Sequence, residues 1–248
     1  MLRTPNDTLA VEYIRAIREA MPQAALLAVP RMGAPHDAPP AALTGQEAFA
    51  SASQLRALLL AGRSDEAFRY IPEPAQDTLR RELRLGRAPA TLAALDVAVL
   101  AQLRRMTPED FARLPDVSEG LENRLYTAVR RATSLDALYA FAKAKRYTHA
   151  RIRRLVLAAF LGLTREDVER PVPYLRVLGH NERGREMLRR AKETARLPVI
   201  LRGKEAFSLD KAAADVYIME CRAADLYALA FPAKQACGLE QTAQVVAL

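Results

Sequence analysis

The chain has 248 residues and a mass of 27.4 kDa, which is enough for one large domain or two small ones. Half of the residues are hydrophobic and 27% are charged, a composition typical of soluble globular proteins. No apolar run reaches the ~18 residues that a membrane span requires, and the first residues lack the apolar stretch of a secretory signal. Cys221 and Cys237 are too few for a disulfide framework or a zinc cluster, so we expect a cytoplasmic protein with reduced thiols.

The charge of the chain is strongly basic. Lysine and arginine number 37 against 29 aspartate and glutamate residues, which gives a net charge of +8 and an isoelectric point of about 9.8. An excess of this size favours a polyanionic partner, most often nucleic acid. The positions of the basic residues along the chain indicate where such a partner would bind better than the total charge does.

The first sixty residues alternate short apolar runs with turns rich in proline and glycine. Apolar residues at helical spacing predict a helix over residues 9–20. Residues 24–30, AALLAVP, form a short apolar run that ends at a proline, which predicts a buried strand. Residues 32–48 predict a loop, and residues 51–62 predict a helix that a serine caps and a glycine ends. The order helix, strand, loop, helix predicts one half of an α/β unit. The strands that should precede this half are not found in the sequence.

Strand signals fade after residue 75, and helical patterns take their place. Thr107 and Ser134 begin helices with acidic first turns. The apolar run PVIL at 198–201 predicts one short strand. The predicted helices cover residues 76–86, 90–104, 107–114, 119–131, 134–143, 148–162, 164–169, 181–195 and 208–230.

Two polar positions in the first part are candidate nucleotide contacts. Asn6 stands between a proline and a helix N-terminus, where its amide can point at a base or a ribose; the alternative is that Asn6, or Asp7, is only the N-cap. Arg31 follows the predicted strand at its C-terminal end, where open α/β sheets bind ligands. Its guanidinium suits phosphate because it donates two parallel hydrogen bonds. His36 and Asp37, adjacent in the loop, are more typical of a hydrogen-bonded loop pair than of a metal site.

A third candidate opens the helix SASQLRALLLAG at 51–62. Ser51 and Ser53 can donate hydrogen bonds to phosphate oxygens while the helix N-terminus supplies positive potential. Arg56 lies one turn further along and can reach the same anion. The alternative is an ordinary amphipathic helix with a serine cap.

The sequence KAKRYTHARIRRL at 143–155 has six basic residues and no acidic one, interleaved with Tyr147 and His149. Basic side chains make salt-dependent contacts with phosphates, and an aromatic ring can stack on an unpaired base. A solvated helix face usually mixes both signs of charge, so this segment predicts an RNA-binding surface. Residues 176–196, with seven basic residues against three acidic ones, could extend it. The candidate RNA contacts are Lys143, Lys145, Arg146, Tyr147, Arg151, Arg153 and Arg154.

Acidic and hydroxyl side chains gather at a turn in LPDVSEGLENRLY at 114–126. They are Asp116, Ser118, Glu119 and Glu122. Because such side chains accept hydrogen bonds from the free N–H groups of a first helical turn, the cluster predicts helix capping rather than acid–base catalysis.

Five segments, taken in chain order, resemble the bacterial tRNA(Met) cytidine acetate ligases. They are PNDTLAVEYIRAI, VPRMGAPHD, ASASQLRALL, LPDVSEGLENRLY and KRYTHARIRRLVLAAFLGL. The later stretch YIMECRAADLYALAF is similar to the C-terminal helix of that family. The resemblance extends from about residue 4 to residue 240 and is most specific at 114–162.

The resemblance implies an adenylate-forming nucleotidyltransferase with an HxGH-type ATP loop. Such an enzyme activates acetate with ATP, which brings Mg²⁺ on its phosphates, and forms acetyl-adenylate. It then transfers the acetyl group to N4 of the wobble cytidine of elongator tRNA(Met). By this resemblance Asn6 matches a nucleotide contact and Arg31 an ATP-binding arginine. By the same resemblance, Ser51, Ser53 and Arg56 match the family motif that binds the triphosphate of ATP.

The fold that the resemblance implies has two parts. The first is an α/β remnant of a Rossmann-like nucleotidyltransferase domain, and the second is a mostly α-helical domain. We therefore expect residues 1–70 to form the C-terminal part of a nucleotide-binding domain. We expect residues 71–248 to form a mainly helical domain that binds tRNA.

The sequence departs from the family at the ATP loop. Its histidines are His36, His149 and His180, and none belongs to an HxGH pair. The first strands and the HxGH loop of the family are not found in the sequence, so the chain is expected to come from a truncated reading frame, which we favour, or to be a fragment or a degenerate relative. Since the loop histidines would stabilise charge on the α-phosphate, we expect a ligase with partial or no activity. The alternative is a non-catalytic tRNA-binding module derived from the family. An enzyme that makes a dinucleotide cofactor fits the basic helical half less well, and acetyl-CoA is a disfavoured donor because no segment resembles an acetyltransferase.

Overall fold

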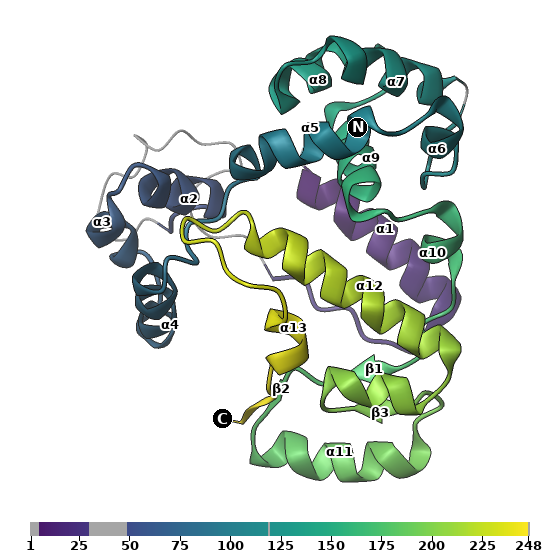
Figure 1. Ribbon diagram of the computed structural model, residues 1–248. Coiled ribbons are helices and arrows are strands. Elements are labelled where there is room, and N and C mark those ends of the chain that lie inside the picture. The colour runs from purple at the N-terminus through teal and green to yellow at the C-terminus, as the bar shows by residue number, and fades with distance from the viewer. Residues whose placement is uncertain (1–4, 30–48, 119, 248) are drawn as a thin grey trace. The chain divides into compact units, whose positions relative to one another are not determined.

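A computed structural model describes residues 5–29, 49–118 and 120–247 of the chain (Figure 1). The chain divides into two compact units, Met1–Pro72 and Glu73–Leu248. We refer to them as unit 1 and unit 2 and describe each by itself.

The described part of unit 1 is helical. It contains α1 (Pro5–Ala20), α2 (Ala52–Leu60) and α3 (Ser64–Phe68). The helices α2 and α3 pack together and bury Leu58 and Ala67. The predicted helix α2 is confirmed, with Ser51 as its N-cap and Gly62 just beyond its end at a positive φ of 72°. Helix α1 begins at Pro5 rather than near residue 9, so Asn6 lies inside its first turn and the prediction that Asn6 is the N-cap is wrong.

The strand predicted at 24–30 is also wrong over its described residues. Residues 24–29 form neither helix nor strand. Their large side chains face solvent, with Leu27 90% and Val29 81% exposed. Within residues 5–29 and 49–72 there is no strand, so this run lacks a neighbour to accept and donate its backbone hydrogen bonds, and a lone strand is not stable in water. The predicted loop at 32–48 lies outside the described residues.

Unit 2 begins with a run of short helices, as the sequence predicts. Thr107 and Thr164 each form a reciprocal capping box with an aspartate three residues later, and Ser134 and Thr148 cap helices by accepting a backbone hydrogen bond. These caps fix where the helices start. The elements are α4 (Glu73–Arg84), η2 (Leu92–Leu95), α5 (Asp96–Arg104), α6 (Pro108–Ala112), α7 (Leu121–Arg131), α8 (Leu135–Ala142), α9 (His149–Leu161) and α10 (Arg165–Glu169).

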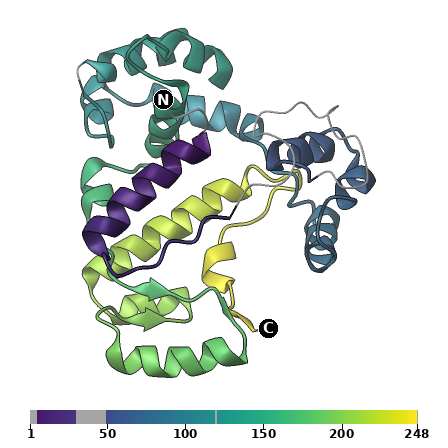
Figure 2. The same cartoon turned by 180° about the vertical axis from the view of Figure 1, so that it is seen from behind.

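One hydrophobic core joins these helices, and α5, α7, α8 and α9 gather around it in both views (Figures 1 and 2). Its centre includes Leu103, Leu125, Leu138 and Ile152, all at most 1% exposed. Each residue comes from a different helix, so burial of their side chains holds the four helices together. We call this set of side chains the first core.

Arginine side chains close the ends of helices in the first core. Arg124 donates hydrogen bonds to the carbonyl oxygens of Phe141 and Ala142, the last residues of α8, and of Lys143, its C-cap. Arg130 donates hydrogen bonds to the carbonyl oxygen of Arg104, the last residue of α5, at 2.6 Å, and to that of Met106 at 3.3 Å. Because the last carbonyls of a helix have no partner within it, such guanidinium groups satisfy them.

The remainder of unit 2 surrounds a second, smaller core. Strand β1 (Leu175–Arg176) pairs in parallel with β3 (Val199–Ile200), and β2 (Gly179–His180) pairs in parallel with β4 (Val246–Ala247). The strand predicted at 198–201 is thereby confirmed. The helices here are α11 (Glu182–Thr194), η3 (Gly203–Ser208), α12 (Lys211–Ala228) and α13 (Leu239–Thr242). The second core is formed by Tyr174, Ile200, Ala206, Ala213, Tyr217 and Cys221.

Glycine and tyrosine meet closely in the second core. A Cβ atom at Gly203 would lie 2.2 Å from Cε2 of Tyr217, so only glycine allows η3 to approach α12 in this way. Burial raises the pKa of Tyr217 to about 12, which keeps its hydroxyl protonated at neutral pH.

We predict that Leu103→Ala destabilises unit 2. Leu103 is fully buried in the first core, and removing its side chain leaves a cavity that costs about 2–5 kcal/mol of unfolding free energy. Chemical denaturation followed by circular dichroism measures the loss. Val97→Ala is the matched control, because Val97 lies on the same helix and is 80% exposed. Equal stability of the two variants would show that the first core is not packed as described.

Candidate functional site

Among the described residues of unit 1, the predicted nucleotide contacts Asn6, Ser53 and Arg56 are exposed and Ser51 is buried. Asn6 lies in the first turn of α1, and Ser53 and Arg56 lie on α2. No hydrogen bond or ion pair joins Asn6 to Ser53 or Arg56 within residues 5–29 and 49–72. Arg31 lies outside the described residues, as do His36 and Asp37.

The N-terminus of α2 is ordered by a serine cap and has no acidic side chain in its first turn. Ser51 is buried, and its Oγ accepts a hydrogen bond from the backbone N–H of Gln54 while its own N–H donates to the Gln54 side chain at 2.8 Å. The first turn contains no acidic residue, so nothing there repels a phosphate. Ser53 and Arg56 add a hydroxyl and a guanidinium to the positive end of this helix.

The basic segment at 143–155 begins where α8 ends. Lys143, Lys145 and Arg146 are exposed in the connection between α8 and α9. Arg153 and Arg154 are exposed on α9, whose opposite face is buried. Since Arg124 binds the carbonyls at 141–143, the start of this segment is fixed to α7. The exposed cations therefore stand on a rigid support.

Two of the predicted RNA contacts, Tyr147 and Arg151, are engaged in contacts within the protein. Tyr147 is only 6% exposed and packs in the first core, so its ring is not available to stack on a base in this structure. Arg151 lies half-buried and binds the turn at Asp116, with Nη2 at 2.7 Å from the Asp116 carbonyl oxygen and 3.1 Å from its carboxylate. Arg151 also donates to Oγ of Ser118.

The acidic turn at 114–126 therefore differs from its prediction. Helix α7 begins after Gly120, which has a φ of 79°, and no side chain caps it. Asp116 itself has a positive φ of 58°, a conformation that aspartate tolerates better than most residues. Instead of capping α7, Asp116 pairs with Arg151. Glu119 lies outside the described residues.

Within residues 176–196, helix α11 forms a separate basic surface, whereas the Arg176 side chain is largely buried and pairs with Glu220 and Glu240. Helix α11 has no buried residue, and it packs on β2, beside the second core. The segment at 143–155 packs on the first core. A hollow of about 900 Å³ adjoins α11, and Lys192 and Lys204 line it without an ion pair in the described chain. Arg202 there is paired with Glu205 at 2.9 Å, and this contact lowers the pKa of the Glu205 carboxyl.

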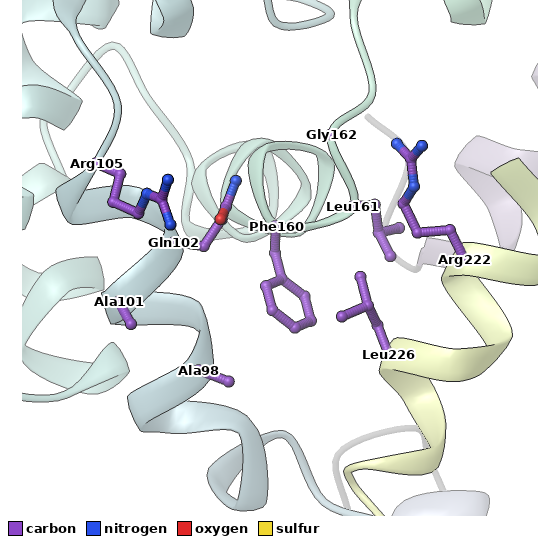
Figure 3. A pocket seen from close by; sticks show the side chains of 9 residues that line it. All are labelled: Ala98, Ala101, Gln102, Arg105, Phe160, Leu161, Gly162, Arg222 and Leu226. Carbon is purple, nitrogen blue, oxygen red and sulfur yellow. The ribbon is translucent and has the colours of Figure 1, made fainter. Parts of the chain in front are cut away.

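Sequence reasoning missed a hollow of about 420 Å³ between α5, α9 and α12 (Figure 3). Its apolar wall includes Phe160, and polar groups from α5 and α12 stand at its edge. Residues 98, 101, 102 and 105 recur at helical spacing, which is the only sequence signal for it. That signal identifies a shared face of one helix but not the two helices that complete the hollow.

Residues 5–29, 49–118 and 120–247 contain no group of three or more histidine, cysteine, aspartate or glutamate side chains placed to hold a metal ion. In the same part of the chain, no helix combines the length and the apolar character needed to cross a membrane.

Comparisons with known proteins agree on one family. The family model described as HIGH Nucleotidyl Transferase matches residues 1–242. A tRNA(Met) cytidine acetate ligase of Syntrophomonas wolfei is 32% identical over 94% of this chain and 57% of its own length. The corresponding ligase of Thermotoga petrophila is 31% identical over 96% of this chain and 59% of its own. The chain thus spans about three fifths of the length of these relatives.

Solved structures give the same result. The apo crystal structure of Thermotoga maritima TmcAL has a TM-score of 0.85 and 27% identity, and the match covers 98% of this chain and 60% of that one. A second TmcAL structure, bound with alpha-thio ATP, has a TM-score of 0.82 and 26% identity over 99% and 60% of the two chains. The resemblance to tRNA(Met) cytidine acetate ligases is confirmed by these relatives, and the chain belongs to the HIGH nucleotidyl transferase family.

Proposed function

We propose that this chain acts in the ATP-dependent acetylation of N4 of the wobble cytidine in elongator tRNA(Met). The observation that carries the proposal is the family match over residues 1–242, together with relatives named as tRNA(Met) cytidine acetate ligases. In the first step, acetate attacks the α-phosphate of ATP, forming acetyl-adenylate and releasing pyrophosphate. In the second step, N4 of the cytidine attacks the acetyl carbon, loses a proton and releases AMP.

Unit 1 is proposed to bind ATP. The N-terminus of α2 supports this role, because Ser53 and Arg56 are exposed there beside free backbone N–H groups and no acidic side chain. Ser51 orders this turn through its capping box with Gln54. Asn6 and Arg31 are proposed as further nucleotide contacts on the strength of the family motifs alone. Mg²⁺ would arrive with ATP, bound mainly by phosphate oxygens.

Unit 2 is proposed to bind the tRNA. Its exposed cations Lys143, Lys145, Arg146, Arg153 and Arg154 adjoin one rigid helical core, and RNA phosphates are the matching polyanion. Fixed cations lose less conformational freedom on binding than cations on a mobile loop, so the support from Arg124 favours affinity.

A second candidate function is a tRNA-binding module without catalysis. One sequence feature favours the non-catalytic module: none of His36, His149 and His180 forms an HxGH pair. The two candidates differ in the first chemical step. A module would bind tRNA with the same salt dependence but would not activate acetate.

We predict that the purified chain, incubated with ATP, Mg²⁺ and acetate, exchanges pyrophosphate into ATP and forms N4-acetylcytidine in elongator tRNA(Met), at a rate that the missing HxGH pair keeps partial. Radiolabelled pyrophosphate measures the exchange, and mass spectrometry of digested tRNA measures the product. Binding of tRNA without either signal would reject the catalytic proposal and leave the second candidate.

We predict that Arg56→Gln lowers the exchange rate about tenfold or more, since a charge-assisted hydrogen bond to phosphate is lost. Arg69→Gln is the control, because Arg69 is an exposed arginine of the same unit that follows α3. An equal effect of both variants would argue against a phosphate contact at Arg56. Binding of tRNA should be unchanged in each.

We predict that replacing Arg153 and Arg154 together by glutamine weakens tRNA binding and reduces the slope of log Kd against log salt by about 1.5. Arg151 is left unaltered because it stabilises the turn at Asp116. Arg80 and Arg81, adjacent on the exposed face of α4, are the matched control pair. An unchanged slope in the α9 variant would show that this surface does not contact RNA phosphates.

A further inference from the structure

The hollow between α5, α9 and α12 is open because its α5 side is built from small residues. Ala98 and Ala101 point into it from one face of α5, and Gln102 and Arg105 continue that face. The helix α9 ends on the opposite side, where Gly162 with a φ of 73° turns the chain away. Because neither alanine fills the space, a volume of about 420 Å³ remains, within the range of small-ligand sites.

The wall of this hollow is apolar. Phe160 is 7% exposed and belongs to the first core, while Leu161 and Leu226 are half-buried beside it. Figure 3 shows the Phe160 ring between α5 on one side and Leu161 and Leu226 on the other. Such a wall favours the flat face of an organic ring over water.

The edge of the hollow is polar and cationic. Gln102 and Arg105 stand together on α5, and Arg222 extends from α12 on the other side (Figure 3). No carboxylate is among the residues that line it. Within the described chain, the side chains of Gln102 and Arg105 have no hydrogen-bond or ion-pair partner. Hydrogen bonds from Thr164 chiefly lower the pKa of Asp167, and the nearby charge of Arg222 adds a smaller contribution, so Arg222 is partly compensated.

This combination matches one chemical class. A nucleotide has a flat base with an apolar face, an edge of donors and acceptors, and an attached phosphate. Guanidinium planes and aromatic side chains stack on unpaired bases, and an amide can both donate to and accept from a base edge. A purely aliphatic ligand would leave Gln102 and Arg105 without partners, which is unfavourable when they are desolvated.

The position of the hollow relates it to RNA. Helix α9 has Arg153 and Arg154 near its start and Phe160 near its end. At 1.5 Å per residue, the six residues from Arg154 to Phe160 span roughly 9 Å along the helix. Neighbouring nucleotides of one RNA can therefore reach both places at once.

We propose that this hollow takes one unpaired nucleotide of the RNA that unit 2 binds, with the base against Phe160 and its edge toward Gln102 and Arg105. The inference rests on the proposed tRNA-binding function. It adds a contact that reads an extruded base, whereas the basic segment at 143–155 reads only backbone phosphates.

Filling the hollow tests this inference. Ala101→Leu places a larger apolar side chain on the exposed α5 face without changing the charge, and Val97→Leu adds a similar side chain to a part of α5 that does not line the hollow. The probe is an elongator tRNA(Met) transcript, with Kd measured by filter binding over a range of salt. We expect Ala101→Leu to raise Kd about tenfold through loss of base stacking, with the salt slope unchanged because no phosphate contact is lost. Val97→Leu should bind like the unaltered chain.

Gln102→Leu is a second variant that keeps the volume of the side chain and removes its hydrogen bonds. It should also raise Kd at constant salt slope. Unfolding midpoints that match the unaltered chain show that each variant is folded. Wild-type affinity in both Ala101→Leu and Gln102→Leu would overturn the inference while leaving tRNA binding by the basic segment in place.

Two other outcomes separate the inference from its alternatives. If Ala101→Leu weakens binding of ATP rather than tRNA, the hollow is a mononucleotide site and the RNA assignment is wrong. If the unaltered chain does not bind the tRNA transcript, both the inference and the proposed function are overturned.

Discussion

The amphipathic packing of α9 is the constraint on which the account of unit 2 depends. One face of this helix is buried in the first core through Ile152, Leu155 and Val156. Burial of these side chains fixes the rotation of the helix about its axis, because turning it would expose them to water. Arg153 and Arg154 are then forced to the solvent side. The same packing places Phe160 at the wall of the hollow, so one helix supplies both candidate RNA contacts.

The basic residues of unit 2 fall into two groups with different physical roles. Arg124, Arg130 and Arg151 donate hydrogen bonds to backbone carbonyls at helix ends and turns. These contacts satisfy acceptors that would otherwise be unpaired, and they leave less charge available to a ligand. Lysines such as Lys143 and Lys145 remain exposed. Net charge alone therefore overstates the surface that is free to bind a polyanion.

Much of the fold could be predicted from the sequence because local signals dominate it. Caps such as Thr107 and Ser134, together with periodic apolar residues along residues 76–230, predict most of the helices of unit 2. The strand expected at 24–30 was wrong because a strand depends on a partner that periodicity does not reveal. The strands β1, β2 and β4, of two residues each, were missed. Strand β3 is equally short and was predicted from the apolar run at 198–201 that contains it.

The candidate site could be predicted only in part. The exposed cations of 143–154 follow from composition, but the burial of Tyr147 and the pairing of Arg151 with Asp116, 35 residues earlier, depend on tertiary packing. The hollow requires three helices that are distant in sequence. For Asn6, Ser53 and Arg56, the assignment to ATP still rests on the family motifs.

Hydrogen exchange of the chain with and without elongator tRNA(Met) tests the central claim most directly, because it reports every segment at once. The account predicts slower exchange in the tRNA complex over residues 143–161 and over the α5 segment 98–105, with α4 unaffected. Protection that appears only outside these two segments would contradict the assignment of α9 as the RNA-binding helix.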